Sequence, residues 1–241
     1  MQLLNRTSLI QNRKSEYIIQ ILRKIYRKTS KSLNLIRMKM LEIKFYPPNY
    51  LYFDNFNELS VIVDAGCGHE AEFSKHLIKK HNLQVFGVDP TMKHTPYLKL
   101  LEESTKGKFR HLAIAVTKKN GFITFHESSQ NESGSILLEH TNMQNDEIIT
   151  YNVESLNLRE LVRRIGTTPI DFMKLDLEGA EYELLDEISD EDINPFKQIF
   201  VEFHHHCTRY STQETKRLVR NICSKGFKVF TLDQHDYLFY K

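Results

Sequence analysis

Short apolar runs alternate with longer amphipathic segments along most of the chain. Runs such as residues 60–65 (SVIVDA) are almost continuously apolar, as expected of strands that are buried on both faces. The predicted strands are residues 60–65, 84–88, 111–116, 122–127, 170–175, 198–203, 227–232 and 237–240. Apolar residues at helical spacing predict helices over residues 73–81, 96–104, 156–165, 181–188 and 212–224. Because strands that alternate with helices form parallel βαβ units, the predicted fold class is α/β.

The sequence predicts a hairpin at the C-terminal end of this pattern and a boundary near its N-terminal end. Only residues 233–236 separate the last two predicted strands, which is a hairpin length, so this end of the sheet includes an antiparallel strand. Near the front, Pro47 and Pro48 cannot continue a helix. We therefore expect an extension of residues 1–44, followed by one α/β domain of residues 45–241.

Charge is distributed unevenly between these two parts. The 241 residues have a formal net charge of only +2, but residues 1–44 contain eleven Lys and Arg side chains and two acidic ones. The extension is therefore basic and the domain acidic. Apolar residues recur at helical spacing within the extension, which predicts a basic amphipathic helix. Its apolar stripe is formed by Ile18, Ile21, Leu22 and Ile25.

The basic helix suggests two kinds of partner. Its apolar stripe is suited to packing on the domain, on a partner protein or on a second copy in a dimer. An anionic membrane surface is the alternative, since basic amphipathic helices bind such surfaces. Nothing in the sequence indicates a specific nucleic-acid partner, because no zinc module or basic sheet with interleaved aromatic residues is present.

Composition narrows the cellular setting. The chain is 40% hydrophobic, which suffices for a large core, and no apolar run is long enough to span a membrane. Cys67, Cys207 and Cys223 are an odd number without paired spacing, so a disulfide framework is not expected. The sequence therefore predicts a cytoplasmic protein, which is peripheral to the membrane if the basic helix binds lipid.

A glycine turn follows the first strand of the domain. Asp64, Gly66 and Gly68 lie between this strand and a helix, and Asp89 ends the next strand, where an acid can bind the ribose of an adenosine. The turn formally fits the dinucleotide fingerprint GxGxxA, which leaves an NAD-binding oxidoreductase as an alternative. However, Asp64 would repel a diphosphate, and it suits the cationic amino-acid end of S-adenosylmethionine (SAM).

A second group of charges lies in residues 174–181 (KLDLEGAE). Alternation along an extended chain places Lys174, Asp176 and Glu178 on one side of it. A solvated loop is the simpler interpretation, in which Glu181 complements the dipole of the next helix. That interpretation does not account for Lys174 and Asp176 in an apolar strand, where charges are costly unless they are paired or used.

Together these motifs resemble the FkbM family of SAM-dependent methyltransferases. The resemblance covers about residues 58–241 in order and spacing, and KLDLEGAE is its most specific piece. The other matching pieces are VDAGCG, VDP and FVEFHHH. The family is similar to other class I methyltransferases, so the resemblance implies a Rossmann-like sheet of seven strands with a C-terminal antiparallel hairpin. It also implies O-methylation of a sugar, glycoconjugate or related natural product.

The resemblance further assigns the cofactor residues. Asp89 matches the acid that binds the ribose, Ala113 with Ile114 matches the stretch beside the adenine, and Asp176 matches the acid beside the transferred methyl group. The full set that matches is Asp64, Gly66, Gly68, Asp89, Ala113 and Asp176. The chain departs from the family within this turn, where the family usually has an Asn and this chain has Cys67, Gly68 and His69. The basic extension has no counterpart in the shared pattern.

Candidate catalytic residues lie at the ends of two strands. A hydroxyl acceptor must lose its proton, and Asp176 is one candidate base. His204 is another, with Glu202 orienting its ring. Asp176, Glu202 and His204 are alternatively candidate ligands for a divalent metal that would polarise the hydroxyl. The simplest interpretation remains that the histidines hydrogen-bond nearby loops.

The polar segment of residues 127–146 is long for a plain connection, so we expect it to cover the acceptor. The sequence thus predicts a SAM-dependent O-methyltransferase that acts on a small-molecule or glycan acceptor. A catalytically silent SAM-binding module, which the basic extension recruits to a partner, is the alternative from a different functional class.

Overall fold

The structure of the chain is a computed structural model, and it describes residues 32–241. Residues 32–40 form a helix in the first of two units, and the boundary between the units falls between Ile43 and Lys44. The amphipathic helix predicted from residues 18–25 lies outside the described residues. Within residues 32–241, no helix has the length and apolar character needed to cross a membrane.

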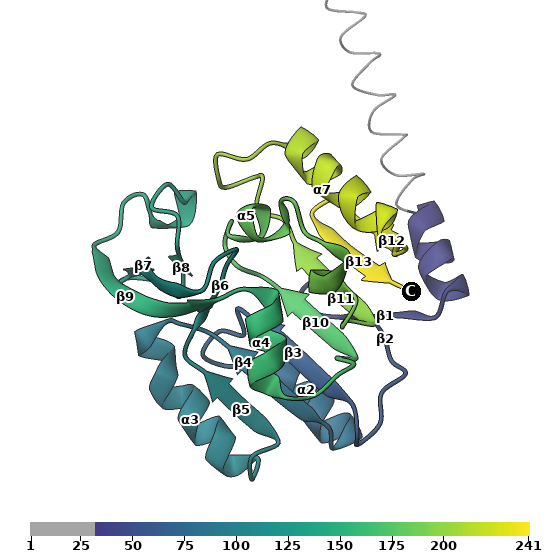
Figure 1. Ribbon diagram of the computed structural model, residues 1–241, viewed down its shortest axis with the longest axis horizontal. Helices are drawn as coiled ribbons and strands as arrows, with labels where there is room; N and C mark the ends of the chain where they lie inside the picture. Colours follow the sequence, from purple (N-terminus) through teal and green to yellow (C-terminus); the bar gives the residue numbers. More distant parts are fainter. Residues whose placement is uncertain (1–31) are drawn as a thin grey trace, which may run out of the picture. The chain divides into compact units, whose positions relative to one another are not determined.

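Seven strands form the central sheet of the second unit, in the order β12-β13-β11-β10-β3-β4-β5 (Figure 1). Their bounds are β3 Val61–Ala65, β4 Gln84–Val88, β5 Phe109–Leu112, β10 Phe172–Leu175, β11 Gln198–Glu202, β12 Lys228–Thr231 and β13 Asp236–Tyr240. Strand β13 pairs antiparallel with β11 and β12, whereas the other neighbours are parallel. The predicted Rossmann-like sheet with a C-terminal antiparallel hairpin is therefore confirmed.

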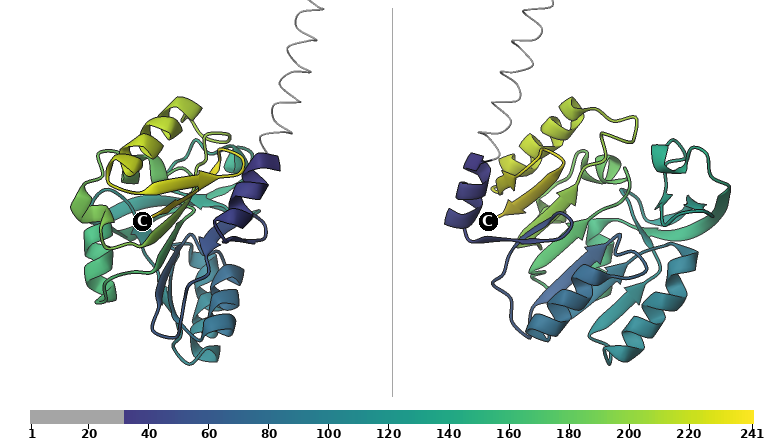
Figure 2. Two further views of the ribbon diagram at one scale, coloured as in Figure 1. Left: turned by 90° about the vertical axis from the view of Figure 1, so that its right-hand side faces the viewer. Right: turned by 180° about the vertical axis from the view of Figure 1, so that it is seen from behind.

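Helices cover both faces of this sheet (Figure 2). Helices α4 and α7 lie on one face and α2 lies on the other. The apolar sides of α4 and α7 bury Leu161 and Leu218 in the same core as Val63 and Met173 of the strands. Each such leucine stabilises the fold by about 1.5–3 kcal/mol. The helices are α2 Glu72–His81, α3 Thr95–Ser104, α4 Leu158–Ile165, α5 Glu181–Leu185, α6 Asp190–Ile193 and α7 Thr212–Ser224, with 3-10 turns η1 Met92–His94 and η2 Thr141–Met143.

A second sheet of four strands has the order β6-β9-β7-β8. Its strands are β6 Ala115–Val116, β7 Gly121–Ser128, β8 Gly134–Ser135 and β9 Ile148–Leu156. Residues 111–116, predicted as one strand, are divided between the two sheets, because β5 ends at Leu112 and β6 begins at Ala115. Strand β9 was not predicted, since its buried and exposed residues are mixed and it lacks a continuous apolar run.

A short hairpin precedes the central sheet. Strands β1 (Ile43–Tyr46) and β2 (Tyr50–Phe53) pair on either side of Pro47 and Pro48, where the sequence predicted only a boundary. Strand β2 contacts β11 and β13, and the ring of Tyr50 meets the ring of Phe200 edge-on, with centroids 5.6 Å apart. The hairpin thereby brings Tyr50 to the carboxyl ends of the central strands.

Candidate functional site

A cavity opens at the carboxyl ends of β3, β4 and β10, which belong to the parallel part of the central sheet. Its volume, including its open mouth, is about 930 Å³. The apolar side chains that line it include Val88, Ile114, Val116, Phe125 and Ile136. The acidic ones are Asp89, Glu132, Asp176 and Glu178. An apolar wall with a few converging polar groups is typical of a small-molecule site.

The glycine turn after β3 lies against the end of β10. Gly66 has a φ of +74°, and a Cβ atom there would lie 1.8 Å from the carbonyl oxygen of Asp176, so this position requires glycine. Gly68 has a φ of +66°, but a Cβ atom there would meet nothing within 4 Å. The turn is therefore packed tightly at Gly66 and leaves open space at Gly68, into which a ligand can fit.

Asp89 connects this turn to the end of β4. Its Oδ2 accepts a hydrogen bond from the backbone N–H of Gly68, and its Oδ1 accepts one from the N–H of Thr91, both at 2.9 Å. His94 Nδ1 lies 3.2 Å from Oδ2. Burial acts to raise the pKa of Asp89, but the hydrogen bonds from His94 and Thr91 outweigh it and lower the pKa. The carboxylate is therefore ionised at neutral pH, and its remaining lone pairs can accept from ribose hydroxyls.

Lys174 is buried at the end of β10 among acidic groups. Its Nζ donates to the carbonyl oxygen of Gly66 at 2.6 Å and lies 3.2 Å from Asp64 Oδ1 and 3.3 Å from Asp176 Oδ2. Burial acts to lower the pKa of Lys174, but the two carboxylates outweigh it and hold the pKa well above its usual value. Asp64, predicted to meet the cationic end of SAM, is thus already paired with a cation of the protein.

His204 follows β11 and contacts the acidic groups beyond β10. Its backbone N–H and its ring Nδ1 lie 2.9 and 3.0 Å from Oε1 of Glu181, and its Nε2 lies 3.5 Å from Asp176 Oδ1. Burial acts to lower the pKa of His204, but Glu181 and Asp176 outweigh it and raise the pKa to about 10. The ring is therefore cationic at neutral pH.

Two sequence-based interpretations change at this histidine. Glu181 was explained as a complement to a helix dipole, but it is fully buried and it orients the ring of His204. Glu202, which the sequence predicted in that orienting role, instead accepts a hydrogen bond from Asn49 Nδ2 at 2.7 Å. The sequence showed the carboxyl of Glu181, the last residue of KLDLEGAE, but it did not show that His204 is its partner.

Glu202 shares Asn49 with a second acid. Asn49 Nδ2 also lies 3.1 Å from Asp236 Oδ1, and Asp236 is directly opposite Glu202 in the pairing of β11 with β13. Burial and the nearby charge of Asp176 raise the pKa of Glu202 to about 7, and burial and Glu202 raise the pKa of Asp236 to about 8. Sequence reasoning missed Asp236, which it assigned to the connection of residues 233–236; the pairing of β11 with β13 places Asp236 beside Glu202.

The polar segment of residues 127–146 reaches the cavity. It contributes Glu132, Ser133, Gly134 and Ile136 to the lining. Its His140 is buried, and His140 Nε2 lies 2.7 Å from Glu178 Oε2 and 3.3 Å from the Sγ of Cys207. The segment is therefore anchored beside the turn that follows β10.

The structure brings most of the predicted residues together. Asp176, Glu202 and His204 offer ligand atoms that all lie within 4.8 Å of one another. Gly66, Gly68, Asp89 and Asp176 line the cavity, whereas Asp64 lines an adjoining hollow with Lys174. Ala113 is exposed and is not part of the lining; its neighbours Ile114 and Ala115 are.

The residues of the cavity fit SAM by their chemistry. The apolar lining around Ile114 suits an adenine ring, and Asp89 suits ribose hydroxyls. The space beside Gly68 is free of protein atoms. The acidic lining suits the sulfonium and ammonium charges of SAM, and it would repel the diphosphate of a dinucleotide.

Comparison with known proteins identifies relatives. A model of the methyltransferase FkbM domain matches residues 39–229. No curated protein sequence matches significantly. Several solved structures are similar, and the chain spans 62% of the length of one of them, which is M. capricolum TrmK in complex with S-adenosyl-homocysteine.

That similarity to TrmK has 13% sequence identity, covers 77% of this chain and has a TM-score of 0.38. The precorrin-6y C5,15-methyltransferase from Geobacter metallireducens GS-15 is 10% identical over 78% of this chain and 82% of that chain, with a TM-score of 0.42. A methyltransferase from Pyrococcus furiosus is 12% identical over 90% of this chain and 98% of that chain, with a TM-score of 0.39.

Proposed function

Because the chain belongs to the FkbM methyltransferase family, we propose that it transfers the methyl group of SAM to a hydroxyl oxygen of a sugar, glycoconjugate or related natural product. Family membership makes the protein a SAM-dependent methyltransferase, as the sequence motifs predicted. The hydroxyl acceptor is the proposal. The single observation that carries it is the carboxylate of Asp176, which lines the cavity at the end of β10.

In this proposal Asp176 is the base that accepts the proton of the acceptor hydroxyl. When bound, SAM supplies an electrophilic methyl group, and its sulfur keeps the electrons of the broken C–S bond while the acceptor oxygen forms the new C–O bond. The oxygen is a poor nucleophile unless a base removes its proton. The side chain of Asp176 is 20% exposed, so it can contact an acceptor in the cavity. Burial raises the pKa of Asp176 above its usual value, which makes the carboxylate a stronger base.

Cations on either side position this base. Lys174 Nζ lies 3.3 Å from Asp176 Oδ2, and His204 Nε2 lies 3.5 Å from Oδ1. Because its pKa is about 10, His204 already carries its proton at neutral pH and cannot act as the base. Glu202 lies outside the cavity lining, and we assign it a positioning role through its charge on Asp176.

A divalent metal is the alternative activator for the same reaction. The ligand atoms of Asp176, Glu202 and His204 lie within 4.8 Å of one another, and Glu181 holds the Nδ1 of His204, as outer-shell carboxylates do for metal-binding histidines. A metal held there would polarise the acceptor hydroxyl. Lys174 already places a positive charge beside Asp176, so we favour the reaction without a metal.

The charge of the lining also indicates the acceptor. Asp89, Glu132, Asp176 and Glu178 line the cavity, and among residues 32–241 no Lys or Arg does. Lys174 and His204 already pair with Asp176, so an acceptor that carries phosphate or sulfate would meet the carboxylates of the lining with no Lys or Arg there to bind it. We therefore propose a neutral, hydroxyl-rich acceptor, such as an uncharged glycan.

The test is transfer of a labelled methyl group from SAM to fractionated neutral glycans by the purified protein. The product is expected to be a methyl ether, and Asp176→Asn is expected to slow its formation by about 10²–10⁴-fold. SAM affinity, measured by calorimetry, should fall much less than the rate, because Asp89, Glu132 and Glu178 remain in the lining. Glu191→Gln is the matched control, because Glu191 is 77% exposed and forms its ion pair with Arg159, which is on the surface.

Three results would change the proposal. Label on nitrogen or carbon would contradict the hydroxyl acceptor, and full activity of Asp176→Asn would contradict its role as base. SAM binding without transfer to any fraction would favour the silent module. For the metal, loss of activity with a chelator and its recovery with a divalent ion would favour the alternative activator.

A further inference from the structure

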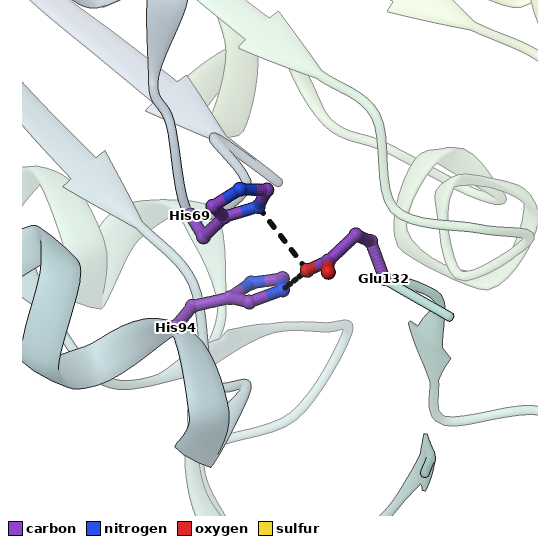
Figure 3. A group of neighbouring side chains, drawn as sticks. All are labelled: His69, His94 and Glu132. Atoms are coloured by element: carbon purple, nitrogen blue, oxygen red, sulfur yellow. Dashed lines mark hydrogen bonds and ion pairs between the residues drawn. The ribbon is translucent and has the colours of Figure 1, made fainter. Parts of the chain in front are cut away.

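Three side chains meet at the edge of the cavity in an arrangement that the proposed reaction does not use. His69 follows the glycine turn, His94 ends η1, and Glu132 lies in the segment of residues 127–146 (Figure 3). His69 Nδ1 and His94 Nε2 lie 3.1 and 2.8 Å from the same carboxylate oxygen, Oε2 of Glu132. The three donor atoms all lie within 4.8 Å of one another. Two imidazoles and one carboxylate from separate parts of the chain thus face one point.

The second nitrogen of His94 is also held. Its Nδ1 lies 3.2 Å from Oδ2 of Asp89, and that carboxylate is fixed in turn by the backbone N–H groups of Gly68 and Thr91. A buried carboxylate that accepts from one ring nitrogen directs the other nitrogen toward a metal and raises its basicity. His94 is itself buried, so its ring orientation is set by the fold.

The local charge favours a cation. Asp89 and Glu132 line the cavity here, and Glu70 Oε1 lies 3.7 Å from His69 Nε2. Within the described part of the chain, no Lys or Arg forms an ion pair with these three carboxylates. The acidic charge is balanced only by the two histidine rings, and a divalent cation would balance it more fully.

The distances agree with this interpretation. Zinc bonds imidazole nitrogen and carboxylate oxygen at about 2.0–2.2 Å, so tetrahedral donors are about 3.3 Å apart. The separations of 3.1 and 2.8 Å from Glu132 to the two rings are close to this value, and the two ring nitrogens lie within 4.8 Å of each other. The side chain of Glu132 is 64% exposed, so it can move to complete the geometry. Three protein ligands would leave a fourth position for water or another ligand.

We propose that His69, His94 and Glu132 bind a divalent transition-metal cation, with Zn²⁺ as the best match for these ligands. The cation ties the segment around Glu132 to the glycine turn beside the cofactor cavity. This site shares no ligand with the group formed by Asp176, Glu202 and His204, so the two can be tested separately. The proposal does not depend on which acceptor the enzyme methylates.

The direct test is titration of the full-length, metal-free protein with Co²⁺ as a spectroscopic substitute for Zn²⁺. One equivalent should produce the visible absorption of a Co²⁺ ion with nitrogen ligands, and Zn²⁺ should displace it. Glu132→Gln and His94→Asn should each weaken Co²⁺ binding by more than tenfold, and Asp89→Asn should weaken it by about 10–100-fold. Glu132→Gln changes an exposed side chain, so it keeps the proposal testable if His94→Asn fails to fold.

A matched control and a second measurement separate this site from other histidines. His126→Ala, on β7, removes a ring whose recorded hydrogen bond is to Thr150 and should leave Co²⁺ affinity unchanged. Adding Zn²⁺ should slow amide hydrogen exchange in residues 129–135 of the unmodified protein but not of Glu132→Gln. The proposal is overturned if no cation binds, or if binding is unchanged in Glu132→Gln and is lost in Glu202→Gln.

Discussion

One carboxylate oxygen of Glu181 accepts hydrogen bonds from both the backbone N–H and the ring Nδ1 of His204, at 2.9 and 3.0 Å. The two residues are 23 positions apart, and they join the turn after β10 to the end of β11. Glu181 Oε2 also accepts from the N–H of Gly179 at 2.9 Å. This buried carboxylate therefore fixes the turn and turns the Nε2 of His204 toward Asp176.

Glu181→Gln should lower the pKa of His204 from about 10 toward its usual value, because Glu181 is the largest cause that raises it. The pKa can be measured by NMR titration of the histidine ring. Since the pKa is raised in the folded state, its contribution to stability is full below the unfolded value, about pH 6.5, and is lost as the pH rises toward 10. Glu181→Gln should reduce this loss. Glu183 is an exposed neighbour on α5, so Glu183→Gln should leave the pKa of His204 and the pH dependence of stability unchanged.

Gly66→Ala and Gly68→Ala should differ in stability although both glycines have positive φ. The new Cβ at residue 66 would lie 1.8 Å from the carbonyl oxygen of Asp176, so the turn or β10 must move. At residue 68 the cost is only the backbone strain, about 1–2 kcal/mol. We expect Gly66→Ala to lower the free energy of unfolding by several times this amount and to abolish SAM binding. Chemical denaturation measures the free energy of unfolding, and calorimetry measures SAM binding. An equal loss of stability in Gly66→Ala and Gly68→Ala would contradict the close packing at Gly66.

The sequence was sufficient to predict the parts of the site that are local. The turn at Gly66, the acid Asp89 at the end of β4 and the C-terminal hairpin each follow from patterns a few residues long. The resemblance then placed Asp176 at the cavity. These features depend on backbone geometry and on parallel strands that end at one edge, which the order of elements already specifies.

The remaining contacts depend on segments that are distant in sequence. Asn49 bonds Glu202 across 153 positions, and nothing in the PPNY segment indicates this. Glu132 meets His94 across 38 positions, from a segment that was expected only to cover the acceptor. Of Ala113 and Ile114, which the resemblance placed beside the adenine, only Ile114 lines the cavity, because the boundary between β5 and β6 decides which side chain faces it. Such pairings arise from tertiary packing, which periodicity does not encode.

Lys174→Met should destabilise the protein by about 3–5 kcal/mol, because it leaves the carboxylates of Asp64 and Asp176 without their buried cation. The double variant Lys174→Met with Asp64→Asn removes one of those charges and should recover part of the loss. Denaturant unfolding of both variants measures the recovery. The stability of Asp64→Asn alone provides the reference. If Asp64→Asn destabilises the Lys174→Met variant as much as it destabilises the unmodified protein, then the interaction of Asp64 with Lys174 contributes little.

The rate of methyl transfer should be low at acidic pH, rise as the base loses its proton and then level off. The base must be unprotonated, and the pKa of Asp176 is raised by burial, while that of Glu202 is raised to about 7 by burial and by Asp176. At acidic pH protons occupy the carboxylates and the rate falls. Glu202→Gln removes a negative charge beside Asp176, so the pKa of Asp176 should fall and the acid limb should move to lower pH. Measurements of kcat from about pH 5 to about pH 9 test this, with Glu191→Gln as the control. If the acid limb of Glu202→Gln stays at the same pH, the two carboxylates do not interact as proposed. A rate that decreases as the pH rises from about 6 to about 8 would contradict a carboxylate base.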